Sequence, residues 1–167
     1  MAPFPPGKGG GDGVAKGFKG KGVLIHCLVD ARGLPLQVVV TAANASERAQ
    51  VMPMLESLRC STGSVGTGKF RPAQIAADKG YDAKWLREAL RGVGIRPEIP
   101  KRVFRTRRQP PGRKLEKRIE RYVVERTFSW FQRKFRRLTT RWERIPSIFQ
   151  AFVDLGMALV LLRKIMG

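Results

Sequence analysis

The sequence predicts an α/β domain, because strand-like and helical patterns alternate along a single chain of 167 residues. A hydrophobic content of 43% is sufficient for a folded core. The chain carries 33 Lys and Arg against 13 Asp and Glu, a net charge of +20, and such a field attracts polyanions. We therefore expect one folded domain that binds nucleic acid, with an anionic membrane surface as the weaker alternative.

The chain opens with a segment of unusual composition, followed by a hairpin. Residues 1–22 are rich in Gly, Pro and Lys and are expected to form a basic arm without an element of its own, leaving 23–167 as the folded domain. Apolar, β-branched runs over 23–30 and 36–41 predict two strands. The short turn between them, which contains Arg32-Gly33, makes these strands an antiparallel hairpin.

The middle of the chain alternates helices with short strands. A helix is expected from about 44 to 59, a strand over 72–78, a helix over 83–93 and a strand over 95–99. This alternation predicts parallel pairing of the two strands. The side chains expected to point inward from the two helices are Val51, Met54, Leu55 and Leu58, and Trp85, Leu86, Ala89 and Leu90.

Asp78 is the first candidate for chemistry. It stands at the end of the apolar run Ile75-Ala76-Ala77 and before Gly80, so a strand would deliver its carboxylate to the carboxyl edge of a sheet. Open α/β folds bind ligands and metals at that edge. The alternative is a solvated turn acid, a common role for aspartate.

A basic loop is expected over 101–114, which contains no acid. Like charges keep such a segment extended until a polyanion is present, and Phe104 offers a ring for base stacking. The alternative is a loop that serves solubility alone. The cations expected to contact phosphates are Lys101, Arg102, Arg105, Arg107, Arg108 and Arg113.

The longest helix is expected over 115–138. Its apolar stripe is formed by Leu115, Ile119, Tyr122, Val123, Thr127, Trp130, Phe131 and Leu138, and its opposite side by Arg118, Arg121, Glu125, Phe128 and Gln132. Periodicity alone leaves Glu125 as an exposed acid paired with Arg121. A last, strongly apolar helix is expected over 145–165, and its wide apolar surface needs cover from the domain or a partner. Its most apolar stretch, 148–162, is too short to span a bilayer and is broken by Gln150 and Asp154.

The single histidine and two cysteines do not suggest a metal or nucleophile site. His26 and Cys27 are adjacent on an expected strand, so their side chains point to opposite faces, and Cys60 has no nearby partner. We expect His26 to be structural.

Five stretches carry a resemblance to insertion-sequence transposases of the Asp-Asp-Glu type, and the similarity runs from about Gly7 to Arg163. Two of them, Ala77–Asp82 and Arg121–Phe128, are specific to that family. The other three are Gly20–His26, Val29–Pro35 and Ala42–Asn44.

The resemblance implies a ribonuclease-H-like mixed sheet flanked by helices, in which three carboxylates hold two divalent metals for cutting and rejoining DNA. Asp78 and Glu125 match the second and third carboxylates, with Mg²⁺ or Mn²⁺ as the ion. Arg121 matches an arginine that contacts phosphate or orients the carboxylate. Lys79 and Arg126 are further phosphate candidates, as is Arg118 on the same helix.

The resemblance departs at the first carboxylate. In the family it lies on a strand directly before the Gly-rich stretch, where this chain begins with Met1-Ala2-Pro3-Phe4. Asp12 and Asp30 are the only acids in the first 46 residues, and neither matches that role. We therefore expect weak metal binding and poor catalysis from the chain alone, as for a frameshift product or a remnant.

The expected partners follow from these observations. They are transposon-end and target DNA, an upstream-frame fusion or the full-length transposase, and further copies of the chain, with no membrane involved. The first six residues do not resemble a signal peptide, so the expected location is the cytoplasm, with the nucleoid. A non-enzymatic basic nucleic-acid-binding protein is the alternative function.

Overall fold

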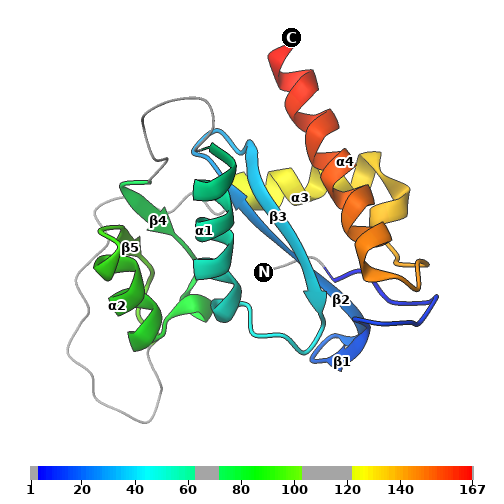
Figure 1. The fold of residues 1–167 in the computed structure, drawn as a ribbon, viewed down its shortest axis with the longest axis horizontal. Coiled ribbons are helices and arrows are strands. Elements are labelled where there is room, and N and C mark those ends of the chain that lie inside the picture. The colour runs from blue at the N-terminus through cyan, green and yellow to red at the C-terminus, as the bar shows by residue number, and fades with distance from the viewer. Residues whose placement is uncertain (1–3, 63–71, 103–121, 167) are drawn as a thin grey trace. The chain divides into compact units, whose positions relative to one another are not determined.

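The computed structural model describes residues 4–62, 72–102 and 122–166. The chain forms two compact units, one from Met1–Gln50 with Tyr122–Gly167 and the other from Val51–Arg121. Both contain helices and strands, so the predicted α/β class is confirmed (Figure 1).

The first unit is built on a three-stranded antiparallel sheet in the order β1-β2-β3. Strand β2 (Gly20–Val29) pairs with β3 (Pro35–Ala42), which confirms the predicted hairpin. The register shifts between Leu28 and Val29, just before the turn. Gly33 in that turn has φ +82°, a conformation that glycine adopts without steric cost.

The Gly-rich start of the chain is more ordered than the sequence predicts. Ala15–Gly17 forms β1 and pairs with the beginning of β2, so the expectation of a segment without elements is wrong. The fully buried Arg141 side chain donates hydrogen bonds to the carbonyl oxygens of Asp12, Glu143 and Arg144. A Cβ on Gly9 would collide with the Trp142 carbonyl, so glycine permits this close backbone approach.

Two helices cover one face of this sheet. Helix α3 (Tyr122–Lys134) and helix α4 (Pro146–Ile165) contribute to one core with residues of β2 and β3. The buried members of that core are Val23, Ile25, Val38, Phe128, Phe131, Leu138, Phe149, Val153 and Val160. The predicted last helix is therefore confirmed.

Two expectations for α3 need correction. Phe128 is buried, although the helical pattern placed it on the side opposite the apolar stripe. The core of sheet and α4 covers a wider arc of α3 than one stripe describes. The helix also ends at Lys134, because Phe135 leaves the helical conformation and a separate 3-10 helix, Arg136–Leu138, follows.

A side chain from α4 covers part of the outer edge of β3. Gln150 Oε1 accepts the Val40 N–H at 2.8 Å, and its Nε2 donates to the Val38 carbonyl at 3.1 Å. Asp154 orients the same amide by accepting a second Nε2 hydrogen bond at 2.8 Å. Such cover removes two backbone groups of β3 from those that another strand could pair with.

In the described part of the second unit, a parallel pair of strands is accompanied by two α-helices. Helix α1 (Val51–Thr62) has the predicted residues Val51, Met54, Leu55 and Leu58 buried, and it follows a 3-10 turn, Arg48–Gln50. Strand β4 (Gln74–Ala76) pairs in parallel with β5 (Arg96–Glu98), as predicted.

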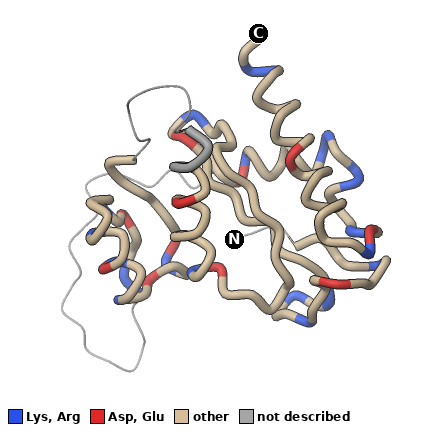
Figure 2. Tube along the Cα trace, in the orientation of Figure 1, with Lys and Arg blue, Asp and Glu red and all other residues tan. Residues whose placement is uncertain are grey.

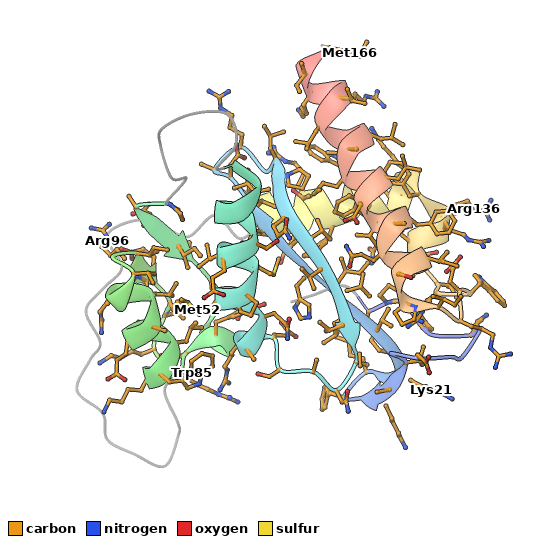
Figure 3. The ribbon with its side chains drawn as sticks, viewed as in Figure 1. Lys21, Met52, Trp85, Arg96, Arg136 and Met166 are labelled. Atoms are coloured by element: carbon orange, nitrogen blue, oxygen red, sulfur yellow. The ribbon has the colours of Figure 1, made fainter. Side chains whose placement is uncertain are left out.

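Helix α2 (Lys84–Gly92) lies between β4 and β5 in the sequence. Leu86 and Leu90 are fully buried, as predicted, but Trp85 is 49% exposed instead of pointing inward. Figure 3 labels Trp85 on this helix. It follows Lys84 at the start of the helix, where a narrow apolar face admits Leu86 and Leu90 and leaves the neighbouring position outside.

Candidate functional site

Asp78 lies two residues beyond the end of β4, at the carboxyl side of the parallel strand pair. It caps the 3-10 helix Lys79–Tyr81, with its Oδ1 accepting the Gly80 N–H at 2.7 Å. The Tyr81 N–H donates to the Asp78 carbonyl at 3.0 Å, so backbone and side chain together fix this turn. The carboxylate is half-buried, and its Oδ2 accepts no hydrogen bond from the described residues.

A second aspartate holds the loop after Asp78 in place. Asp82 accepts two hydrogen bonds from Arg87 and one from the Arg102 N–H at 2.7 Å. Arg87 also donates to the Ile99 carbonyl at 2.7 Å. Partial burial alone would raise the pKa of Asp82, but the Arg102 N–H and the Arg87 guanidinium hold it below its ordinary value. Sequence patterns missed this pair, because Arg87 lies five positions after Asp82, outside the spacings of three and four that indicate paired residues on a helix.

Glu125 lies in the first turn of α3 and is exposed. Its helix is fixed to the hairpin turn by the two residues that follow. Arg126 Nη2 donates to the Arg32 carbonyl at 2.6 Å, and the buried Thr127 Oγ1 donates to the Gly33 carbonyl at 2.7 Å. The hairpin turn therefore fixes the position from which Glu125 projects.

Neither early acid is grouped with these carboxylates by a contact in the structure. Asp30 Oδ1 accepts the N–H groups of Arg32 and Leu34 at 2.9 and 2.8 Å, so this carboxylate organises the hairpin turn. Asp12 offers its backbone carbonyl to Arg141. Within residues 4–62, 72–102 and 122–166 there is no group of three or more His, Cys, Asp or Glu able to hold a metal.

The two candidate carboxylates have the right chemistry for a hard divalent ion. Mg²⁺ prefers carboxylate oxygens, Asp78 keeps Oδ2 for such a bond, and Glu125 is exposed. Asp78 belongs to the second unit and Glu125 to the first. The carboxylate oxygens of both residues therefore suit Mg²⁺. Each residue is held by its own unit, Asp78 by a 3-10 turn and Glu125 by α3.

Four of the cations expected to contact DNA lie in the described residues. Lys79, Lys101, Arg102 and Arg126 are all exposed. Arg126 has a structural part as well, because its guanidinium also lies 5.3 Å from the Trp130 ring centre. The other candidates lie outside the described residues: Arg105, Arg107, Arg108, Arg113, Arg118 and Arg121.

Further cations gather at the end of α3, a cluster that sequence reasoning did not single out. Figure 2 shows Lys and Arg positions around this helix end and the 3-10 helix after it. Exposed members are Arg133, Lys134, Arg136 and Arg137, and Figure 3 labels Arg136. Arg137 pairs with the buried Glu143 at 2.7 Å.

His26 is buried in β2, Cys27 beside it is half-buried, and the two do not form a reactive pair. His26 Nε2 lies 2.7 Å from Thr41 Oγ1, while Nδ1 has no partner among the described residues. Burial lowers the pKa of His26, with a smaller opposing effect of Glu47. Burial raises the pKa of Cys27 to about 12.

These observations define a mixed α/β protein with a net charge of +20 and two candidate carboxylates, Asp78 and Glu125. A family model described as Transposase DDE domain matches residues 4–161. The chain therefore belongs to the transposase DDE domain family. No solved structure matches the chain.

Curated relatives are insertion-sequence proteins. A putative transposase for insertion sequence element IS402 from Burkholderia cepacia is 40% identical over 135 residues, which cover 81% of this chain and 60% of the relative. A putative transposase for IS6501 from Brucella ovis is 30% identical over 139 residues, or 83% of this chain and 97% of the relative. The transposase for IS1106 from Neisseria meningitidis serogroup B is 33% identical, with 66% of this chain and 36% of the relative covered.

In residues 4–62, 72–102 and 122–166, no helix, α4 included, is long and apolar enough to cross a bilayer.

Proposed function

We propose that this chain acts in DNA transposition as the catalytic-domain part of an insertion-sequence transposase with a ribonuclease-H-like fold. The observation that carries the proposal is the family match over residues 4–161, which includes both candidate acids. Asp78 at the carboxyl side of β4 and Glu125 in the first turn of α3 would be two of the metal ligands. The substrate would be transposon-end DNA and target DNA. The protein would act in the cytoplasm, in association with the nucleoid.

Each candidate acid has a defined part in the proposed chemistry. When bound to Asp78 and Glu125, Mg²⁺ or Mn²⁺ would activate an attacking oxygen and stabilise a leaving oxygen in phosphoryl transfer. The hydrogen bond from the Gly80 N–H restrains Asp78 Oδ1, so Oδ2 would be the oxygen that binds the ion. The anchors of Arg126 and Thr127 on the hairpin turn orient the helix that carries Glu125.

The isolated chain should bind DNA more effectively than it cuts it. Two carboxylates in a field of +20 hold a cation weakly, and Asp30 is engaged in its own turn. We expect no robust cleavage of terminal-repeat DNA with Mg²⁺ or Mn²⁺. Strong cleavage that disappears in Asp78→Ala would show instead that the chain is competent alone.

Metal dependence separates this proposal from a non-enzymatic nucleic-acid-binding protein, which the charge of +20 favours. Mn²⁺ binding, followed by calorimetry on the isolated chain, should weaken in Asp78→Asn and in Glu125→Gln. Glu88→Gln is the matched control, because Glu88 is an exposed acid on α2 with only a 3.8 Å contact to Lys84. Equal Mn²⁺ binding by all four proteins would contradict the assignment of the two acids.

Salt dependence tests the DNA contacts without requiring cleavage. If about six cations contact phosphates, the logarithm of the binding constant should fall with the logarithm of salt concentration at a slope of about −5. Replacing Lys101 and Arg102 together by Gln should make the slope less steep by about 2 if each contacts one phosphate. Fluorescence anisotropy with labelled duplex measures both slopes. A flat response would contradict binding through phosphates.

A further inference from the structure

Helix α4 has two apolar faces, and among the described residues only one of them is buried in the core. The other is largely exposed, apart from Phe152, whose ring lies 5.4 Å from the Arg137 guanidinium. The inner face is buried, with Phe149, Val153, Gly156 and Val160 turned toward the core. The outer face exposes large side chains at regular intervals. These are Ile148 (45% exposed), Phe152 (36%), Leu155 (56%), Leu159 (45%), Leu162 (51%) and Met166 (83%).

The outer residues follow a heptad pattern. Their spacing alternates between four and three residues throughout, the repeat by which one helix packs against another in a coiled coil. No charged residue lies in this row. From this pattern we infer that two copies of the chain pair through the outer seam of α4, with the two helices antiparallel.

The exposed area is suited to a stable pair. If a large apolar side chain exposes roughly 200 Å² when free, the printed exposures of the six seam residues amount to roughly 600 Å² of apolar surface. A typical monomer tolerates patches of about 300–600 Å², and a specific interface buries about 800 Å² on each partner. The seam with its flanking side chains therefore approaches what a dimer requires.

Charge favours a second copy over DNA, and antiparallel over parallel pairing. DNA offers no apolar surface to a row that lacks cations. The only charged residues near the C-terminal end of α4 are Arg163 and Lys164. Lys164 points away from the seam toward Trp130, whereas Arg163 flanks the seam. A parallel pair would bring the two Arg163 side chains near each other, whereas an antiparallel pair separates them and keeps the two strongly cationic bodies at opposite ends of the helices.

The rest of the unit holds the seam in a fixed orientation. Gln150, on the opposite side of the helix from Phe152, is hydrogen-bonded to β3. A Cβ on Gly156 would meet Leu138 Cδ1 at 3.1 Å, so α4 also packs closely on that side. No residue from Leu161 to Met166 is buried, and Figure 1 shows the end of α4 extending beyond the strands. One contact with α3 remains there, because the Lys164 ammonium lies 5.2 Å from the Trp130 ring centre. Met166 marks that end in Figure 3.

The first test measures mass in solution, and it does not depend on DNA binding or on the proposed function. Sedimentation of the intact chain between about 1 and 100 μM should show a concentration-dependent rise from the 18.7 kDa monomer to twice that mass. The double variant Leu155→Glu/Leu159→Glu should remain a monomer. Ser147→Glu, exposed on the same helix outside the seam, should dimerise like the parent.

Because Leu155 and Leu159 are exposed, the double variant should keep the parent's circular dichroism spectrum. If it does not fold, Leu162→Glu, in the part of α4 beyond Val160, provides the same test with less risk to the core. A parent chain that stays monomeric over the whole range would overturn the proposal. A dimer that survives both sets of changes would overturn it as well, because another surface would then be responsible.

Disulfide cross-linking tests the direction of the helices. An antiparallel pair centred near residue 157 brings Leu155 of one copy next to Leu159 of the other. In a Cys60→Ser background, a mixture of Leu155→Cys and Leu159→Cys chains should form the mixed disulfide fastest. Faster cross-linking within Leu155→Cys alone would indicate parallel helices and overturn the proposed arrangement.

Discussion

The two candidate carboxylates are held in place in different ways. Asp78 is fixed by its own turn, through a hydrogen bond from a residue only two positions away. Glu125 is positioned by tertiary contacts, because Arg126 and Thr127 anchor its helix on a hairpin turn that lies 94 residues earlier in the chain. A local motif can therefore be recognised from sequence, whereas the placement of Glu125 depends on the packing of the first unit.

The largest loss of stability is expected from a substitution in the core that holds α3, the helix that carries Glu125. Phe131→Ala removes a ring that is 1% exposed in the core of the first unit, and such a change costs about 3–5 kcal/mol. Urea unfolding followed by circular dichroism measures the loss. Gln132→Ala, at the exposed neighbouring position, is the control and should change stability little. Similar losses for both would mean that α3 is not packed as described.

The next largest effect tests the anchor itself. Gly33→Ala places a Cβ at φ +82°, about 3.1–3.3 Å from Arg126, Val123 and Thr127. A non-glycine residue in that region costs about 1–2 kcal/mol before any crowding. Gly92→Ala is the matched control, since a Cβ there meets nothing within 4 Å. Equal unfolding midpoints for the two variants would contradict a tight contact between hairpin turn and helix.

An acid-dependent loss of stability should come from the first unit. Burial lowers the pKa of His26 from 6.5, so the unfolded chain binds a proton more readily than the folded one. The contribution of His26 to stability is thus present above pH 6.5 and is lost as the pH falls below it. Thermal unfolding should show a weaker pH dependence in His26→Gln than in the parent. An unchanged dependence would contradict a role for this imidazole.

The smallest change in stability is expected at the turn of Asp78. Gly80→Ala would bring a Cβ within 2.8 Å of Asp78 Oδ1 and displace the carboxylate. The lost hydrogen bond is worth about 0.5–1.5 kcal/mol at most, and exposure of the turn reduces this. Mn²⁺ affinity should fall more clearly than the unfolding midpoint. A large loss of stability would show that the turn of Asp78 also depends on contacts with distant parts of the chain.

Part of the fold could be predicted because it depends on short-range patterns. The hairpin of β2 and β3, the helix α2 and the parallel pairing of β4 with β5 all follow from periodicity and turn residues. The exceptions are informative. Phe128 is buried because the core covers more of α3 than one stripe, and Trp85 is exposed because α2 has a narrow buried face.

By itself, the sequence determined the α/β class, the excess of positive charge and the family, because these depend on composition, local periodicity and motifs that stay intact along the chain. Tertiary structure alone decided that Arg141 would be buried against the Gly-rich start, that Gln150 would cover part of the edge of β3 and that one face of α4 would stay open. Each of these features depends on which distant parts of the chain pack together. No local sequence pattern encodes that choice.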